Sequence, residues 1–598
     1  MWLMFGLLAL ATTSVVSVPV SAVKNTSVGA LRCNKLSTGV MECLGLPFAA
    51  PPTGPLRFAA TVDAVGPLDG SGPFDATSFG AACPQAAGQI PDPGATSEDC
   101  LTINVWSPAT SNSDDDSPPA AVMHWIYGGG FAQGGSASFN GSTLAARHDV
   151  VVVSSNYRLG ALGFTALREH AARNGTTGNW AFLDQQSALR WVQRNVATGF
   201  GGDPDLVTIF GQSAGAGSVD AHLLAPTSGG LYTRAILESG GLDGIVALPW
   251  ALGVGDGVAA RLGCGNYSAA AAAADVAADA ADAGGGGGDR LRCMRAASVE
   301  QVLAASGGGD MGNPVIACAF GRPEDCTDFT LAADGVVFDG SAWDLTARSS
   351  DAVNANADVM LGTNTNDGSL FAIGYFDSLN ASGYAELVRA VVSKDQRLKG
   401  NADPTPAQLQ RALALYPPAP EAAGVPLANV TAANLATLST ILTDSQFLCG
   451  SQLIASGLAS GANKSRGVFQ YRYNYNATFA GFCYSSWSAD YGITHTAELS
   501  MVFGQPTYVF GPITSDLPAC TFNAEDAAMA QLVGELWTSF AKGGAPTATS
   551  DVFPKASGWP RWDAASEQQL VIDAGPLKVE ARWRAEQCAY WTSTERGL

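Results

Sequence analysis

The sequence predicts an α/β fold built on a large, mostly parallel sheet, and three observations support this. Several apolar, β-rich runs end in glycine or asparagine, as is typical of strands buried on both faces of a parallel sheet. Helical patterns lie between these runs, and such alternation predicts crossover connections. A Gly-Gln-Ser-Ala-Gly segment lies where one predicted strand becomes a helix. The predicted strands lie within 121–130, 149–160, 206–211, 233–241 and 357–364.

Composition narrows the class of protein. The chain has 598 residues, of which 47% are hydrophobic and 14% charged, so a large core is expected and disorder is not. The formal net charge of −21 argues against nucleic-acid binding, which needs a basic surface. No linker or internal repeat divides the sequence. We therefore expect a single domain over 23–598.

The first 22 residues resemble a secretory signal peptide. Their apolar part is too short and too rich in Ser and Thr to span a membrane. Val20-Ser21-Ala22 fits the small-residue rule for cleavage, so we expect Val23 to begin the mature chain. One departure is that no Lys or Arg precedes Lys24. No other stretch is long enough to cross a bilayer, and we expect a secreted, extracellular protein.

Cysteines and glycosylation sequons agree with export. The chain has 12 cysteines, and an even number after a signal peptide favours disulfides over metal sites or free thiols. Cys264 and Cys293 flank the low-complexity segment 270–289, which we interpret as a surface loop closed by a disulfide. Eight Asn-x-Ser/Thr sequons predict a glycoprotein, namely Asn25, Asn140, Asn174, Asn266, Asn380, Asn429, Asn463 and Asn476.

The central strand and helix signals surround a candidate nucleophile. Residues 206–211 predict a strand, and Gly211-Gln212-Ser213-Ala214-Gly215 follows it directly. A Gly-x-Ser-x-Gly turn between strand and helix is a nucleophile elbow, which presents the serine hydroxyl at a helix N-terminus. A dinucleotide-binding loop is excluded, because Asp220 stands where the last glycine would be required. A second helical pattern, over 179–197, repeats Leu183, Leu189, Val192 and Val196 at roughly helical spacing.

A serine nucleophile needs a base, and the chain has only five histidines. In a fold with this elbow the order along the chain is serine, acid, histidine. His124, His148 and His170 precede Ser213, and His222 is carried away along the same helix. The remaining histidine, His495, is therefore the expected base.

The acid and the oxyanion donors are expected at loops that follow strands. Asp367 follows the apolar run that ends near Gly362, although many other carboxylates exist. Three glycines follow the strand within 121–130, and glycines let backbone N–H groups approach a substrate oxygen closely. We expect Gly129, Gly130 and the N–H of Ala214 to form an oxyanion hole.

The chain resembles the type-B carboxylesterases, the α/β-hydrolase family that includes carboxylesterases, cholinesterases and fungal lipases. The matching stretches span nearly the whole predicted mature chain. They are GLPFAAPPTGPLRF (45–58), EDCLTINVW (98–106), the block 178–219 around the nucleophile, FGQP (503–506), LWTSFAKGGAP (536–546) and WPRW (559–562). The resemblance implies an α/β-hydrolase fold and a triad of Ser213, His495 and Asp367. The family's usual glutamate is an aspartate at position 367.

The resemblance also implies disulfides Cys83–Cys100, Cys264–Cys293 and Cys449–Cys588. Spacing suggests Cys33–Cys43 and Cys318–Cys326, which leaves Cys483–Cys520.

The implied activity is hydrolysis of carboxylic esters through an acyl-enzyme, with a small-molecule ester as substrate and neither cofactor nor metal. The segment between Cys83 and Cys100 contains no aromatic residue, which argues against a choline ester as the preferred substrate. It is also too short for the long lid of the fungal lipases. Short or medium acyl esters are expected. The alternatives are a lipase acting on longer glycerides and a non-catalytic adhesion protein, while Phe131 could line the acyl pocket or belong to the core. The oligomeric state is left open.

Overall fold

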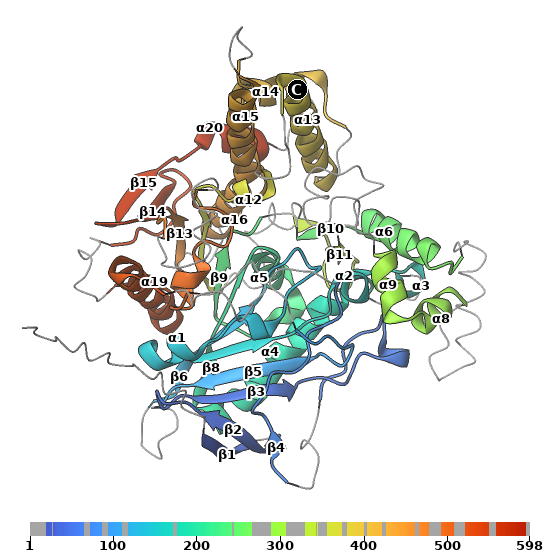
Figure 1. The fold of residues 1–598 in the computed structure, drawn as a ribbon, viewed down its shortest axis with the longest axis vertical. Helices are drawn as coiled ribbons and strands as arrows, with labels where there is room; N and C mark the ends of the chain where they lie inside the picture. The colour runs from blue at the N-terminus through green and yellow to red at the C-terminus, as the bar shows by residue number, and fades with distance from the viewer. Residues whose placement is uncertain are drawn as a thin grey trace, which may run out of the picture.

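A computed structural model describes most of the chain. The described residues are 20–26, 28–64, 72–86, 94–109, 118–171, 176–241, 244–265, 289–306, 329–342, 344, 356–372, 379–399, 403–420, 426–460, 466–477, 492–506, 521–548 and 558–593. Within them, thirteen strands form one sheet in the order β1-β2-β3-β5-β7-β6-β8-β9-β12-β13-β14-β15, with β4 paired to β2. Helices surround this sheet (Figure 1). The predicted α/β fold class, a large and mostly parallel sheet flanked by helices, is confirmed.

The centre of the sheet is parallel. The strands there are β7 (Val151–Ser155), β6 (Ala120–Ile126), β8 (Gly202–Gln212), β9 (Arg234–Glu238), β12 (Asp358–Asn364), β13 (Val468–Tyr473) and β14 (Gln568–Ile572). Every residue of β6, β7 and β12 is buried, as expected for strands covered on both faces. The five predicted runs each overlap one of these strands.

The edges of the sheet are mainly antiparallel. One edge is formed by β1 (Val20–Thr26), β2 (Gly29–Lys35), β3 (Met41–Pro47) and β5 (Thr102–Ser107), with the short β4 (Phe74–Asp75) parallel to β2. The other edge is β15 (Lys578–Ala581), antiparallel to β14. Strand β1 begins three residues before the predicted start of the mature chain. Residues 1–19 lie outside the described part, and cleavage after Ala22 stays a prediction.

Two helices lead into the central strands. Helix α4 (Trp180–Phe200) packs against β8 and ends at Gly201, whose φ of +67° caps it. The predicted segment 179–197 lies within this region. Helix α5 (Ala214–Leu224) packs against β8 and β9 and directly follows the candidate nucleophile. Residues 179–224 therefore contain helix α4, strand β8, the serine turn and helix α5 in that order, and both helices pack against β8.

The remaining helices and strands complete the layers. They are α1 (Ser142–His148), α2 (Gly160–Phe164), α3 (Arg168–Ala171), β10 (Ile245–Ala247), α6 (Leu248–Arg261), α8 (Asp289–Ala296), α9 (Val299–Ala305), β11 (Leu331–Ala333), α12 (Ser369–Ala372), α16 (Cys449–Ser460), α18 (Leu499–Val502) and α19 (Ala524–Gly543). Strands β10 and β11 form a separate parallel pair. None of the described helices is long and apolar enough to cross a membrane.

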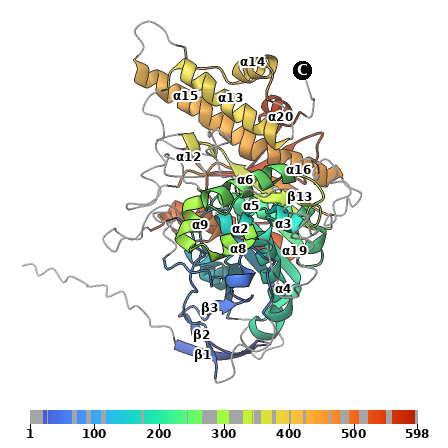
Figure 2. The same cartoon turned by 90° about the vertical axis from the view of Figure 1, so that its right-hand side faces the viewer.

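A second hydrophobic cluster lies beyond the main core. Helices α13 (Ala381–Leu398), α14 (Pro406–Leu415), α15 (Leu427–Leu442) and α20 (Ala585–Trp591) gather around it, at the opposite end of the molecule from β1 and β2 (Figures 1 and 2). The cluster also contains Phe371 and Phe447. These helices were not predicted from the sequence.

Four disulfides join described residues: Cys33–Cys43, Cys83–Cys100, Cys264–Cys293 and Cys449–Cys588. The first links β2 to β3, and the last links α16 to α20. The expected Cys318–Cys326 and Cys483–Cys520 pairs lie outside the described residues, as does nearly all of the low-complexity segment 270–289.

Candidate active site

The candidate nucleophile is the single residue between a strand and a helix. Strand β8 ends at Gln212 and α5 begins at Ala214, so Ser213 is the turn, with φ 59° and ψ −128°. This conformation is strained for a residue with a side chain. The backbone N–H of Ser213 donates to the carbonyl of Glu238 on β9 (2.9 Å), which ties the turn to the next strand.

The two glycines of the motif are sterically required. A methyl group on Gly211 would lie 2.7 Å from the carbonyl carbon of Gly215, and one on Gly215 would collide with the carbonyl oxygen of Ile126. Real side chains do not approach backbone atoms so closely. The close packing of β8, α5 and the end of β6 therefore explains why glycine stands at both positions.

His495 and Asp367 form a buried pair beside this turn. The imidazole Nδ1 lies 2.8 Å from Asp367 Oδ1, and both side chains are buried. The other carboxylate oxygen, Oδ2, accepts from the N–H of Asn364 (2.7 Å) and the hydroxyl of Ser239 (2.9 Å). Asp367 thus has three donors, which hold it in one orientation toward the imidazole.

Gln212 places the histidine next to the elbow. Its Nε2 lies 3.1 Å from Nε2 and 3.4 Å from Nδ1 of His495. Because one atom is nearly equidistant from two nitrogens of the same small ring, the amide lies over the ring face rather than in line with one nitrogen. The residue that precedes Ser213 therefore contacts the base expected from sequence. Gln212 was not predicted from the sequence, although its place inside the Gly-x-Ser-x-Gly motif was the available signal.

The other four histidines have different surroundings. His124 Nε2 contacts Ser155 Oγ (3.0 Å), and His222 Nδ1 contacts Ser228 Oγ (2.8 Å). Burial lowers the pKa of both rings to about 3, with the charge of His124 adding to the effect at His222, so both are neutral near pH 7. His170 packs edge-on against Trp180, and His148 ends α1.

The three consecutive glycines lie against the elbow. We call Tyr127–Gly134 the oxyanion turn, after the two glycines in it that the sequence predicts as oxyanion donors. A methyl group on Gly128 would lie 2.9 Å from Ser213 Cβ, so this turn passes directly beside the serine. Gly129 and Gly130 have φ of 108° and 60°, a region that favours glycine. Helix α5 begins at Ala214, whose N–H belongs to the helix N-terminus.

Aromatic side chains surround the imidazole and the oxyanion turn. The ring centroids of Phe447 and Phe371 lie 4.7 and 5.2 Å from that of His495. Phe131, in the oxyanion turn, is buried and its ring lies 4.9 Å from that of Phe164. Phe371 and Phe447 were missed in the sequence because phenylalanines are mostly core residues and their spacing carries no signal.

Two buried glutamates lie behind the acid. Asn364, whose N–H holds Asp367, donates through its side chain to Glu498, and Trp537 donates to Glu238 (2.7 Å). Burial raises the pKa of Glu498 to about 8, with the charge of Asp367 adding to the effect, and burial together with the charge of Glu498 raises that of Glu238. At neutral pH this cluster therefore retains protons that ordinary carboxylates would lose.

Together, the mostly parallel sheet and the serine elbow define an α/β-hydrolase. Comparison with known proteins gives the family. A model of the carboxylesterase family matches residues 20–591. Pyrethroid hydrolase Ces2e from Rattus norvegicus is 44% identical over 235 residues, which are 37% of this chain and 40% of that protein. The match to this relative thus spans about two fifths of its length. The chain belongs to the carboxylesterase family.

Proposed function

We propose that the protein is a secreted serine hydrolase of carboxylic esters, with Ser213 as nucleophile, His495 as base and Asp367 as the acid that orients it. The observation that carries this proposal is the contact of the His495–Asp367 pair with Gln212, the residue before the elbow serine. The family match supports the same chemistry.

In the proposed mechanism the serine hydroxyl attacks the ester carbonyl while the imidazole takes its proton. Asp367 holds the imidazole orientation and stabilises the imidazolium. The backbone N–H groups of Gly129, Gly130 and Ala214 stabilise the oxyanion of the tetrahedral intermediate. His495 then protonates the leaving alcohol, which leaves an acyl-enzyme. Water repeats the sequence and releases the acid.

The preferred substrates are proposed to be soluble esters with short or medium acyl chains. The segment between Cys83 and Cys100 is fixed near its start by two hydrogen bonds to Gly134. The Gln85 amide accepts from the N–H of Gly134 (2.9 Å) and donates to its carbonyl (2.8 Å). This attachment argues against a lid that swings open at an oil surface. The name of the rat relative makes a pyrethroid one candidate substrate.

The test of catalysis is covalent labelling with a fluorophosphonate probe. We expect the wild type to be labelled and the Ser213→Ala variant to be neither labelled nor active on p-nitrophenyl esters. Ser460→Ala, a change at an exposed helix end, is the matched control and should behave as wild type. A folded wild type without labelling or ester turnover would instead support the non-catalytic binding protein.

The substrate class is tested with a panel of esters. Soluble acetate to octanoate esters and a pyrethroid are compared with emulsified long-chain triglycerides. We expect higher kcat/KM on the soluble short esters and no jump in rate when the substrate forms an emulsion. Preference for the emulsion would favour the lipase alternative.

Secretion is tested by locating and sequencing the expressed protein. We expect the protein expressed with its natural N-terminus to appear in the medium, beginning at Val23 and carrying N-linked glycans. N-terminal sequencing and glycosidase treatment measure both. Retention of the uncleaved chain inside the cell would contradict secretion.

A further inference from the structure

The ends of the oxyanion turn are held by side chains that have no part in the proposed proton transfers. At its first residue, the hydroxyl of Tyr157 donates to the carbonyl of Tyr127 at 2.6 Å. At its last residue, the Gln85 amide bonds the N–H and carbonyl of Gly134. In the middle, the N–H of Gly160 donates to the carbonyl of Phe131 (2.8 Å).

The bond from Tyr157 fixes a peptide plane at the edge of the site. The carbonyl of Tyr127 and the N–H of Gly128 belong to one planar peptide unit, so holding the carbonyl also sets the direction of that N–H. Gly128 packs on Ser213, and a methyl group on Gly215 would lie 2.9 Å from the carbonyl carbon of Tyr127. The first peptide of the turn is therefore fixed against the elbow on one side and by Tyr157 on the other.

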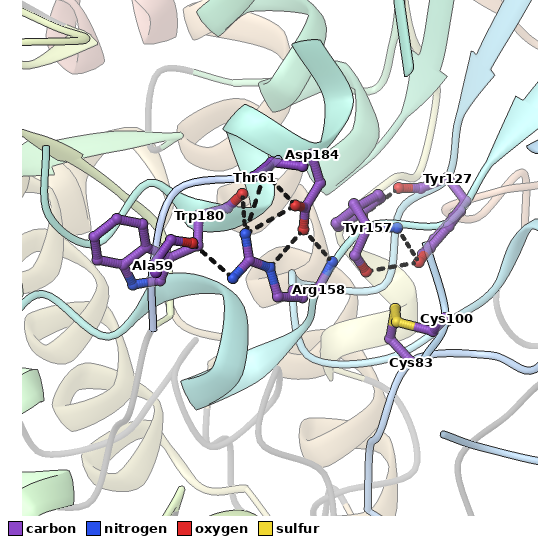
Figure 3. Close-up of polar contacts among 9 residues, drawn as sticks. All are labelled: Ala59, Thr61, Cys83, Cys100, Tyr127, Tyr157, Arg158, Trp180 and Asp184. Atoms are coloured by element: carbon purple, nitrogen blue, oxygen red, sulfur yellow. Dashed lines mark hydrogen bonds and ion pairs between the residues drawn. A yellow bond between two sulfur atoms is a disulfide. The ribbon is translucent and has the colours of Figure 1, made fainter. Parts of the chain in front are cut away.

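Tyr127 and Tyr157 contact each other through stacked rings and through hydrogen bonds. Their rings stack at 4.4 Å with an angle of 18° between planes, and Figure 3 shows the side chains facing each other. The hydroxyl of Tyr127 donates to the carbonyl of Tyr157 (3.3 Å) and accepts from its N–H (3.4 Å). Burial raises the pKa of both hydroxyls above their usual value, so both remain donors at every working pH.

Tyr157 is itself anchored by its neighbour. Arg158 forms a buried ion pair with Asp184 of α4 through Nε and Nη2 (both 2.8 Å), and its own N–H bonds the same carboxylate (3.0 Å). Its Nη1 also bonds the carbonyl of Ala59 (2.9 Å), as Figure 3 shows. A helix of the main layer thus holds Tyr157 in place, and Tyr157 holds the turn.

Gln85 gives the other end a comparable anchor. Its amide is buried and also donates to the carbonyl of Cys83 (3.1 Å), the cysteine bonded to Cys100. The amide thus links Gly134 to the disulfide-bonded segment. The oxyanion turn is therefore held by two loop residues, Gln85 and Tyr157, that are far apart in sequence.

We propose that Tyr157 and Gln85 are positioning residues for the oxyanion hole, which hold the oxyanion turn from its two ends so that its amides meet the developing anion. This inference rests on the proposed function and extends it. An oxyanion hole stabilises charge only where its donors are already in place, so loosening either end should affect the transition state more than substrate binding.

The first variant is Tyr157→Phe, which removes one hydroxyl and keeps the ring stack. We expect kcat on p-nitrophenyl butyrate to fall on the order of 10- to 100-fold, with KM changed little. The matched control is Tyr384→Phe, in which another buried tyrosine loses a bond to a backbone carbonyl (Tyr416, 2.8 Å) in the second hydrophobic cluster. It should retain wild-type kcat.

A transition-state analogue separates positioning from general loosening. A trifluoromethyl ketone adds to the serine and forms an oxyanion in the hole, whereas the matching neutral alcohol does not. In Tyr157→Phe we expect the inhibition constant of the ketone to rise in proportion to the loss of kcat/KM, while that of the alcohol stays near wild type. Equal weakening of both ligands, or kinetics equal to those of Tyr384→Phe, would overturn the proposal.

Gln85→Glu provides an independent test if Tyr157→Phe does not fold. This change keeps an oxygen that can accept from Gly134 and removes the donor to its carbonyl. We expect the same selective loss of ketone affinity, and an unchanged ketone affinity in the folded variant would overturn the role of Gln85. Failure of the proposed function is distinguishable, because the wild type itself would then show no ester turnover and no labelling.

Discussion

At the scale of single residues, the position of Asp367 depends on its donors. The aspartate is one methylene shorter than the glutamate usual in the resembled family, and its loop brings it within 2.8 Å of the imidazole. Three hydrogen bonds to its two oxygens leave little freedom for rotation. The loop that follows β12 therefore places the shorter carboxylate within hydrogen-bonding distance of the imidazole.

We predict that Asp367→Asn lowers kcat on the order of 10⁴-fold, because the amide favours the wrong imidazole tautomer. Asp403→Asn, at an exposed position, is the matched control. Steady-state kinetics of the two purified variants, with circular dichroism to check folding, measures the effect. A loss smaller than tenfold would remove Asp367 from the proposed triad.

Single residues also show the limits of prediction from sequence. Ser213 and His495 could be predicted as candidates because a local motif indicates one and the order of the histidines leaves the other. Gln85 and Tyr157 carried no such signal, because each contacts the backbone of a segment distant in sequence. No periodicity records such a contact, and it exists only after the sheet has formed.

At the scale of elements, the elbow depends on the space between β6, β8 and α5. We predict that Gly215→Ala abolishes fluorophosphonate labelling and lowers the free energy of unfolding by about 1–3 kcal/mol, as overpacking does. Gly253→Ala in α6 is the control, because its added methyl group meets no atom within 4 Å. Chemical denaturation and gel labelling test both, and a labelled, stable Gly215→Ala variant would contradict the steric argument.

Elements differ in how well the sequence predicted them. Strands β6, β7, β8, β9 and β12 were predicted because burial on both faces makes their sequences largely apolar, whereas the central strands β13 and β14, which carry polar residues, were not predicted. Strand β8 begins at Gly202, four residues before the predicted run, because Gly202 pairs with Ala120 ahead of a shift in register, and an apolar pattern does not detect this pairing. Helices α13 to α15 were missed, since they form a separate cluster without any catalytic motif.

At the scale of the whole molecule, buried titratable groups set how stability depends on pH. Glu498 has a pKa raised to about 8 in the folded state, against an ordinary value of 4.5. The folded protein binds this proton more tightly than the unfolded chain, so the stabilisation is complete below pH 4.5 and is lost as pH rises through about 8. His124 and His222 act oppositely, because their lowered pKa removes stability as pH falls from 6.5 toward 3.

We predict that the free energy of unfolding falls between pH 6.5 and 8, above the range in which His124 and His222 respond, and that Glu498→Gln makes this fall less steep. The slope, rather than the absolute stability, is the readout, because the substitution also changes hydrogen bonds. Urea denaturation at several pH values measures it. Glu386→Gln, at an exposed position on α13, should keep the wild-type slope, and an unchanged slope in Glu498→Gln would contradict the prediction.

The Cys449–Cys588 bond has a consequence for biogenesis. It closes a loop over 139 positions, and that loop contains β13 and His495. Because the chain is made from its N-terminus, Cys588 is synthesised after all of this loop, so the crosslink can form only once β13 and His495 have been made. Ser213 is made well before His495, so a nascent chain that stops between them would carry the proposed nucleophile without the proposed base.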